Sequence, residues 1–328
     1  MNVGIFVISL DYEMLWGAIF NKSVENGYHC RTQYIGEIIP ALLNLFERYH
    51  IHATWATVGA IACDSKEQAL QHASKMIYDP YSSQSLIDFI KSIQPTDEFV
   101  YFSPKVVKEI SSCAGQEIGS HTYTHFYFNE HTDALSKLNE ELEASKIILE
   151  KKTNKKVVSL VMPKNQVAED IKKSMSKNGM SIYRGVQVSR RFNKHNKFFR
   201  IIHFLDSYIP VCGDSTYTLN EIKEEDFYNV RASAFWRTYY RHLGCFEYLK
   251  LWRIKKQMMY AAKKGKIFHL WFHPHNLGME YKKNLKMLES ILIYYKYLNK
   301  KYGMISCNMS ECAKIYDDFL DKKSNNKQ

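Results

Sequence analysis

The segment that most constrains the fold is a short apolar run close to the N-terminus, residues 3–10 (VGIFVISL). Its β-branched and aromatic residues follow one another without polar alternation, which is typical of a strand buried on both faces of a parallel sheet. Apolar residues at helical spacing follow at Ile35–Tyr49, and strand character returns at residues 52–58. This strand–helix–strand order predicts a parallel α/β architecture.

The same unit of a strand and a helix recurs along the rest of the chain. The spacing predicts helices at residues 104–112, 132–152, 170–178, 248–264 and 283–302, and strands at residues 116–120, 157–162, 181–184 and 266–272. Residues from about 63 to 110 are more polar, which predicts a helical insertion with little core of its own. We therefore expect one α/β domain over residues 1–320, shaped as a (β/α) barrel, and a polar C-terminal tail at residues 321–328.

The charge balance limits the partners only weakly. The chain carries 45 Lys and Arg against 34 Asp and Glu, a formal net charge of +11. The basic residues are spread along the chain, which favours a solvated surface, although the charge permits contact with an anionic membrane or a phosphorylated substrate. Because neither zinc-finger spacing nor a Walker-type loop occurs, no nucleic-acid partner is expected.

The cysteines and the first apolar run indicate the compartment. The seven cysteines are odd in number and irregularly spaced, which is typical of reduced thiols. No basic residue precedes the first apolar run, and Asp11 and Glu13 interrupt it, so it is interpreted as neither a signal peptide nor a membrane span. The sequence therefore predicts a cytoplasmic protein.

Two carboxylates, Asp11 and Glu13, follow the first predicted strand. With one residue between them, they point to the same side if strand geometry continues. One could then bind a metal while the other accepts a proton. The alternative is an exposed loop that carries two acids and has no chemical role.

Two histidines, His121 and His125, follow the strand predicted at residues 116–120. Imidazoles four residues apart can face one way on a helical turn, which suits one divalent metal ion. Gly119, just before them, allows a close backbone approach. The alternative is a pair of exposed histidines.

The third cluster lies at the end of the strand predicted at residues 266–272. Alternation places His269, Trp271 and His273 on one face, and Pro274 ends the strand. A histidine at the carboxyl end of a strand can act as a general acid. The alternative is a half-buried histidine cluster without chemistry. In a closed parallel barrel the strand ends meet at one mouth, so the three clusters are expected to form one site.

In chain order these motifs resemble those of the polysaccharide deacetylases of the NodB-homology type, carbohydrate esterase family four. ISLDYE resembles the first motif, EIGSHTYTH the second and HLWFHPHN the last. Between them, SLVMPKNQ followed by YRG is similar to the third-motif region of a subgroup often found beside surface-polysaccharide genes. The resemblance runs from about residue 5 to residue 277 and implies the deformed (β/α) barrel of that family.

The resemblance implies a divalent metal held by His121 and His125, with zinc expected and cobalt, manganese or nickel as alternatives. In the common first motif, a second aspartate that binds the metal directly follows the aspartate that acts as base. Tyr12 stands at that second position here. The resemblance therefore implies that Asp11 is the base and Glu13 the ligand, and the reverse assignment stays open.

The third motif of the family usually carries an arginine where this chain has Val161. Either Lys164 or Arg184 is expected to supply that positive charge. The resemblance further implies that Asp206 orients His273. Two more residues of the last motif are expected to support the site: Trp271 and His275.

The activity implied is metal-dependent hydrolysis of an N-acetylated sugar, nucleotide- or lipid-linked, in surface-polysaccharide synthesis. Asp11 would take a proton from water, and His273 would protonate the leaving amine. The basic stretches RIKKQ and AAKKGK would suit an anionic carrier or peripheral membrane contact. The alternatives are another C–N hydrolase, similar to allantoinase or an imidase, and a non-catalytic carbohydrate-binding module that keeps the fold. The oligomeric state is left open.

Overall fold

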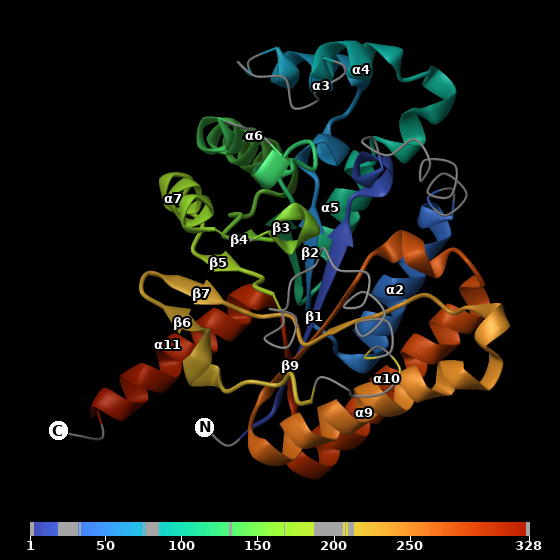
Figure 1. Ribbon diagram of the computed structural model, residues 1–328, viewed down its shortest axis with the longest axis vertical. Helices are drawn as coiled ribbons and strands as arrows, with labels where there is room; N and C mark the ends of the chain where they lie inside the picture. Colours follow the sequence, from blue (N-terminus) through green and yellow to red (C-terminus); the bar gives the residue numbers. More distant parts are fainter. Residues whose placement is uncertain are drawn as a thin grey trace.

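The computed structural model describes most of the chain and is shown in Figure 1. The described residues are 3–18, 32, 34–74, 76, 85–130, 133–166, 168–186, 206, 208 and 213–325. Their centre is one sheet with the strand order β6-β7-β5-β4-β3-β2-β1-β9-β8, in which β10 also pairs with β1. The β6–β7 ladder is antiparallel, whereas the other ladders between these strands are parallel. The predicted parallel α/β architecture is therefore confirmed.

The strands are short except at the centre of the sheet. Their bounds are β1 Ile5–Tyr12, β2 Ala53–Thr57, β3 Gln116–Ser120, β4 Ser159–Leu160, β5 Ile182–Tyr183, β6 Lys223–Glu224, β7 Phe227–Asn229, β8 Ala234–Phe235, β9 Ile267–Phe272 and β10 Ile305–Cys307. The β1 strand is longer than predicted, because the ladder to β2 continues through Asp11 and Tyr12. Strand geometry therefore continues into the acidic motif.

Helices surround the sheet on both sides (Figure 1). Their bounds are α2 Ile35–Tyr49, α3 Lys66–Ala73, α4 Leu86–Ser92, α5 Pro104–Ser112, α6 Ala134–Thr153, α7 Glu169–Lys177, α9 Glu247–Lys264, α10 Tyr281–Tyr302 and α11 Met309–Asn325. In Figure 1, α6, α7 and α11 lie on one side of β1, and α2, α9 and α10 lie on the other. Each helix predicted from apolar spacing is present within a few residues of its predicted bounds, which is the usual uncertainty of helix ends.

The two faces of β1 pack against different surroundings. Ile5 and Val7 belong to an apolar cluster that combines residues of other strands with residues of α11 and of the segments after strands. Phe6 and Ile8 belong to a larger cluster that includes the inner faces of the helices. Because side chains alternate along a strand, Asp11 lies on the same face as Ile5 and Val7. The acidic motif therefore continues the inner face of the sheet.

The sheet is curled like a barrel. Strands β1 and β5 are four positions apart in the sheet, which would separate them by about 19 Å if the sheet were flat. Yet the side chain of Arg184, just after β5, contacts Asp11 of β1 directly. Only a strongly curled sheet permits this contact, so the predicted deformed (β/α) barrel is confirmed.

The described residues between 63 and 110, which lie between β2 and β3 in the chain, are largely helical. The α3 and α4 helices lie at the top of Figure 1, away from the sheet, whereas α5 packs against β3. Three-residue to six-residue 3-10 helices complete the connections: η1 Met14–Gly17, η2 Gly59–Ala62, η3 Pro95–Val100, η4 Phe128–Glu130, η5 Pro163–Asn165, η7 Leu219–Ile222, η8 Arg241–Phe246 and η9 Pro274–Leu277. The division into one domain with an insertion stays a prediction.

The C-terminal segment differs from the prediction of a polar tail at residues 321–328. The α11 helix continues through Asn325, and residues 326–328 lie outside the described part of the chain. Ile315, Tyr316 and Phe319 pack this helix against the inner apolar cluster. Once anchored, the helix extends through polar residues because each added residue costs little after nucleation.

Candidate active site

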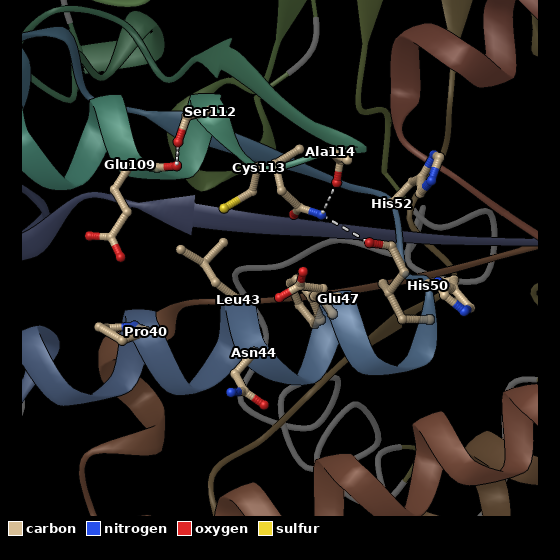
Figure 2. A pocket seen from close by; sticks show the side chains of 13 residues that line it. Pro40, Leu43, Asn44, Glu47, His50, His52, Glu109, Ser112, Cys113 and Ala114 are labelled. Atoms are coloured by element: carbon tan, nitrogen blue, oxygen red, sulfur yellow. Dashed lines mark hydrogen bonds between the residues drawn. The ribbon is translucent and has the colours of Figure 1, made fainter.

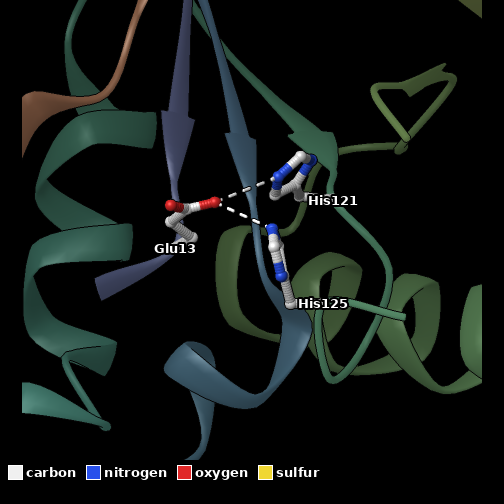
Figure 3. A group of neighbouring side chains, drawn as sticks. All are labelled: Glu13, His121 and His125. Atoms are coloured by element: carbon white, nitrogen blue, oxygen red, sulfur yellow. Dashed lines mark ion pairs between the residues drawn. The ribbon is translucent and has the colours of Figure 1, made fainter. Parts of the chain in front are cut away.

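Glu13, His121 and His125 form a buried group whose ligand atoms all lie within 4.8 Å of one another. One carboxylate oxygen of Glu13, Oε2, lies 2.8 Å from His125 Nε2 and 3.5 Å from His121 Nε2. Figure 3 shows both imidazoles turned toward this oxygen. The residues come from the end of β1 and from the loop after β3, so parallel strand ends bring the acid and the histidine pair together.

Hydrogen bonding orients the first imidazole of this group. His121 Nδ1 lies 2.6 Å from the carbonyl oxygen of Val161, so Nδ1 carries the proton and donates it. The lone pair of Nε2 then faces Glu13. Burial lowers the pKa of His125 below its ordinary value, which Glu13 only partly offsets, so the neutral imidazole is favoured. The fixed orientation of His121 and the neutral ring of His125 both suit a metal ligand.

The His121–His125 segment is a loop and not the helical turn that we predicted. Thr122 and His125 have φ angles of +64° and +66°, in the left-handed region that is unfavourable for residues with a Cβ atom. Such strain persists only where the surroundings fix it. The buried carboxylate of Glu141 on α6 does so: it accepts hydrogen bonds from the backbone amides of Tyr123 and Thr124, at 2.6 and 2.8 Å.

The alternation along β1 separates Tyr12 from the two acids. Asp11 and Glu13 face the site, as predicted, whereas the Tyr12 ring packs edge-on against Trp55 with the ring centres 6.5 Å apart. Gly17 lies directly beside the carboxylate, because a Cβ atom built there would be 2.3 Å from Glu13 Oε1. The absence of a side chain at Gly17 therefore leaves the space that Glu13 occupies.

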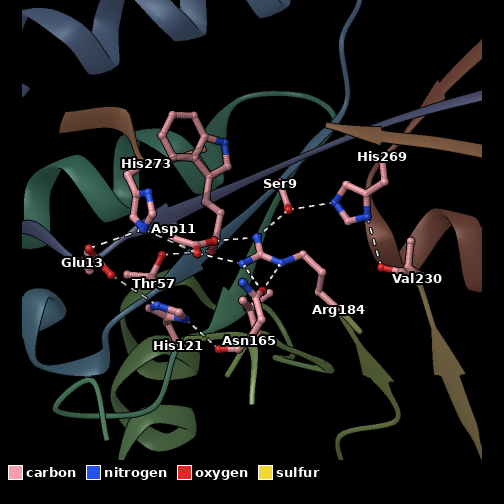
Figure 4. A network of polar contacts seen from close by, with 12 residues as sticks. Ser9, Asp11, Glu13, Thr57, His121, Asn165, Arg184, Val230, His269 and His273 are labelled. Carbon is pink, nitrogen blue, oxygen red and sulfur yellow. Dashed lines mark hydrogen bonds and ion pairs between the residues drawn. The ribbon is translucent and has the colours of Figure 1, made fainter. Parts of the chain in front are cut away.

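Arg184 supplies the positive charge that the sequence lacks at Val161. Its NH1 and NH2 groups donate hydrogen bonds to Asp11 Oδ1 and Oδ2, at 2.7 and 2.8 Å, and both side chains are buried. Burial alone would raise the pKa of Asp11, but the Arg184 guanidinium and neighbouring histidines outweigh it, and the pKa lies below its ordinary value. Asp11 is therefore held as an oriented carboxylate (Figure 4).

The remaining contacts of Arg184 come from residues that the sequence did not single out. Asn165 Oδ1 accepts hydrogen bonds from Nε and NH2, and Ser9 Oγ accepts one from NH1. The ring of Trp271 stacks on the guanidinium, 4.2 Å from its central carbon. Ser9 could have been found by extending the alternation of Asp11 back by two residues, whereas Asn165 gave no signal.

His269 completes the network behind the arginine. Its Nδ1 lies 3.1 Å from the carbonyl oxygen of Val230, and its Nε2 lies 2.8 Å from Ser9 Oγ. Burial and the nearby positive charge of Arg184 lower the pKa of His269 to about 3, so the ring is neutral. The Ser9 hydroxyl can then donate to His269 while it accepts from Arg184, which satisfies all three groups.

His273 lies beside both acids, as expected for the last motif. Its Nε2 is 3.8 Å from Asp11 Oδ2 and 3.6 Å from Glu13 Oε1. The side-chain amide of Asn276 lies 3.2 Å from Nδ1, so Nδ1 can accept and Nε2 carries a proton toward the acids. His275 is buried next to it, with the two ring centres 5.2 Å apart.

Two of the supporting residues have other contacts than predicted. Asp206 accepts a hydrogen bond from Arg253 at 2.6 Å, whereas the contacts of His273 are with Asp11, Glu13, Asn276 and neighbouring rings. The structure therefore gives Asp206 a different neighbour from the one we expected. Lys164 lies over the Tyr127 ring at 3.6 Å and not beside Asp11. Arg184 already occupies the place that Lys164 was expected to fill.

A separate pocket of about 540 Å³ lies between α2 and α5 (Figure 2). Its lining includes Glu47, His52 and Cys113. This pocket is found where β2 and β3 begin, whereas Glu13 and the histidine pair lie where strands end. It therefore plays no part in the site described above.

The donor set fits a divalent metal ion. Two neutral imidazoles and one carboxylate are the ligands of many catalytic zinc sites, which keep one coordination position open for water or substrate. The three residues are buried, and Val161 fixes the orientation of His121 from behind. The arrangement thus combines a candidate metal site with an oriented carboxylate and a histidine on the same inner face of the barrel.

Comparisons with known proteins agree with this fold. Residues 24–183, just under half of the chain, match the family described as polysaccharide deacetylase. The matched segment includes His121 and His125 but begins after Glu13 and ends before Arg184. No curated protein sequence matches the chain. Across the described residues, no helix combines the length and the apolar character needed to cross a bilayer.

Two solved structures have the same fold at low sequence identity. One is from Mycobacterium smegmatis and is described as a polysaccharide deacetylase; its TM-score is 0.61 at 11% identity, with 98% of this chain and 92% of that chain covered. The other is the Puue allantoinase, with a TM-score of 0.53 at 14% identity and coverage of 94% of this chain and 89% of that chain. At this level of identity, both comparisons show a shared fold and nothing further.

Proposed function

We propose that this protein is a metal-dependent hydrolase that removes the acetyl group from an N-acetylated sugar. The observation that carries the proposal is one arrangement. Glu13, His121 and His125 form a metal-like donor set within 4.8 Å, and Asp11 and His273 lie directly beside it. The match of residues 24–183 to the polysaccharide deacetylase family supports the same reaction class.

The proposed ligands are Glu13, His121 and His125, with zinc as the expected ion and cobalt, manganese or nickel as alternatives. When bound, the ion would polarise the amide carbonyl and lower the pKa of a water molecule toward about 7. The geometry favours Glu13 as the ligand over Asp11. Glu13 is the acid that contacts both imidazoles, whereas both oxygens of Asp11 are bound by Arg184.

Asp11 is the proposed general base. The paired hydrogen bonds from Arg184 fix its orientation, and its lowered pKa keeps it ionised at neutral pH. It would accept a proton from the water whose oxygen attacks the acetyl carbon. Arg184 acts through Asp11 and is a positioning residue.

His273 is the proposed general acid. Its Nε2 faces the acids with a proton, because Nδ1 accepts from Asn276. When the carbon–nitrogen bond breaks, this proton would go to the sugar nitrogen, and the products are acetate and a free amine. The two proton-transferring groups thus lie on the same inner face as the proposed metal ligands. One can act when water adds to the carbonyl, and the other when the amine leaves.

The proposed substrate is an N-acetyl sugar carried on a nucleotide or a lipid, in cytoplasmic steps of surface-polysaccharide synthesis. Lys164 supports an anionic carrier. It is exposed, has a φ angle of +56° and lies over Tyr127, whose ring packs edge-on against the proposed ligand His125. A phosphate beside the reacting sugar would meet this ammonium group.

A second candidate is hydrolysis of a small cyclic amide or ureide. The acids spaced by one residue and the fold likeness to an allantoinase favour it. The third reading, a non-catalytic carbohydrate-binding module, rested on the missing arginine at Val161. Arg184 bound to Asp11 removes that support.

The test is acetate release from N-acetyl sugars by zinc-loaded protein, free and linked to a nucleotide or polyprenyl phosphate. We expect acetate release, which Asp11→Asn and His273→Gln should each reduce by a factor of about 100 or more. The control is His52→Gln, which lies where β2 begins, at the other end of the strands, and should not change acetate release. Ring opening of allantoin without acetate release would favour the second candidate, and no turnover of either substrate class would contradict both.

A further inference from the structure

The outward face of α9 carries large aromatic side chains in water. Tyr248, Trp252 and Tyr260 are 69%, 50% and 41% exposed, and Phe246, directly before the helix, is 60% exposed. Tyr248 and Trp252 are four residues apart, as are Trp252 and Lys256, so these three follow one stripe along the helix. Scattered single exposed apolar residues are ordinary, whereas several on one helix face mark a binding surface.

The exposed side chains of this stripe are not the ones that pack α9 against the core. The opposite face of α9 is already buried against the domain through Leu251, Ile254, Met258 and Ala261. The neighbouring helix α10 packs beside α9 and exposes Ile293 at 55% (Figure 1). The exposed residues of these two neighbouring helices, Tyr248, Trp252, Lys256, Tyr260 and Ile293, are here called the α9–α10 face.

The α9–α10 face is also strongly basic. Of the eight Lys and Arg between residues 241 and 266, Lys250 and Arg253 are buried in ion pairs with Glu247 and Asp206 and do not belong to this face. Lys256, Lys263 and Lys264 are exposed. The Lys256 ammonium lies 4.9 Å from the centre of the Trp252 ring. Aromatic and cationic groups thus lie interleaved.

We propose that the α9–α10 face binds the surface of a lipid bilayer that contains anionic lipids. Trp and Tyr favour the zone between the headgroups and the acyl chains, where an apolar ring and a polar edge are both satisfied. Lysines beside them interact with anionic headgroups, and their long stems lie along the apolar boundary. The inference does not depend on the proposed deacetylase reaction.

Charge complementarity favours a bilayer over a second copy of this chain. In a two-fold symmetric dimer, each face would meet an identical one, so two surfaces with exposed lysines would be brought together. Like charges in such an interface repel each other. An anionic lipid surface instead neutralises them.

The direction of α9 relates this face to the site. The helix leads back to the start of β9, so its N-terminal end, with Trp252, lies nearer than its C-terminal end to the strand ends that carry the site.

Trp252 provides a direct reporter of lipid contact. Of the five tryptophans, Trp16, Trp55, Trp236 and Trp271 are buried, and Trp252 is half exposed. We expect phosphatidylcholine vesicles that contain phosphatidylglycerol and brominated phosphatidylcholine to quench the protein fluorescence. The same vesicles should leave the emission of Trp252→Phe unquenched, although that variant still sediments with them. Absence of quenching in the wild-type protein at saturating anionic vesicles would overturn the proposal.

Vesicle cosedimentation of further variants tests the two parts of the surface. Lys256→Gln and Lys263→Gln should each weaken binding about fivefold, and Trp252→Ala roughly tenfold. The matched controls are Lys151→Gln on α6 and Phe99→Ala, which alter an exposed lysine and an exposed aromatic residue elsewhere and should change nothing. Unchanged thermal unfolding of each variant would exclude misfolding as the cause.

Three further results would overturn the proposal. One is vesicle binding that does not depend on phosphatidylglycerol or that falls equally in the control variants. Another is a dimer in light scattering that Trp252→Ala dissociates, which would assign the face to a second copy. The third is binding of a DNA or RNA oligonucleotide through Lys256 and Lys263 without binding to vesicles.

Discussion

Arg184 binds both carboxylate oxygens of Asp11, at 2.7 and 2.8 Å, although Asp11 lies in β1 and Arg184 follows β5, four positions away in the sheet. The pair is buried and has Ser9, Asn165 and Trp271 around it. The curl of the barrel therefore does two things. It closes the inner core, and it places a fixed cation behind the carboxylate that we propose as the base.

Replacing Arg184 with methionine should leave the Asp11 carboxylate buried without its partner. Breaking a buried ion pair in this way costs about 3–5 kcal/mol of unfolding free energy. Chemical denaturation would measure the loss. The control is Arg231→Met, whose ion pair with Glu221 is half exposed and should contribute less than about 1 kcal/mol. The double variant Arg184→Met/Asp11→Asn should recover part of the stability, and a loss equal to the sum of the two single losses would contradict the pairing.

Gly17→Ala should weaken metal binding, because the new Cβ atom would lie 2.3 Å from Glu13 Oε1 and displace the carboxylate. We expect an affinity loss of roughly 10-fold to 100-fold, similar to that of altering a contact behind a metal ligand. Titration with zinc by calorimetry would measure it. Gly36→Ala is the matched control, since nothing lies within 4 Å of its added Cβ atom. Equal affinities for the two variants would show that Gly17 has no such role.

Glu141→Gln should loosen the loop that carries the histidine pair. Glu141 Oε2 accepts from the amides of Tyr123 and Thr124, and Oε1 accepts from the Thr124 hydroxyl, so a glutamine with one acceptor oxygen cannot replace both. We expect the unfolding free energy to fall by about 1–3 kcal/mol and metal binding to weaken as well. Glu143→Gln, exposed on the same helix, should be neutral. The prediction fails if thermal unfolding and metal affinity match the wild type.

The His52–Glu311 pair should make stability depend on pH. His52 Nδ1 donates a hydrogen bond to the Glu311 carboxylate, at 2.8 Å, which raises the pKa of His52 in the folded state above its ordinary value of 6.5. The folded state thus holds the proton more tightly, so the contribution is complete below pH 6.5 and is lost as the pH rises through the higher folded value. Unfolding free energy should fall over this window in the wild type and less so in His52→Gln. Identical slopes would contradict the contribution of the pair.

The sequence alone predicted the residues whose position follows from strand periodicity. Asp11, Glu13 and His273 stand at strand ends with the correct alternation, so the structure places them on one inner face. The motif spacing likewise identified His121 and His125 as neighbours. It did not predict their loop, because the positive φ angles at Thr122 and His125 depend on tertiary support from Glu141.

The residues that were missed act across long distances in the chain. Asn165 and Ser9 meet Arg184 only because the sheet curls, and no local pattern encodes the degree of curl. The choice between Lys164 and Arg184 was open for the same reason. Asp206 could not be assigned to Arg253 either, since that ion pair joins segments 47 residues apart.

The most direct test of the account is titration of the metal-free protein with cobalt, followed by visible absorption. We expect one ion per chain, with intense bands of a low-coordinate site that Glu13→Ala, His121→Ala and His125→Ala each abolish, whereas His52→Gln keeps them. Stoichiometric binding that survives loss of both His121 and Glu13, or no binding of cobalt or zinc at all, would contradict the proposed metal site and the hydrolase built on it.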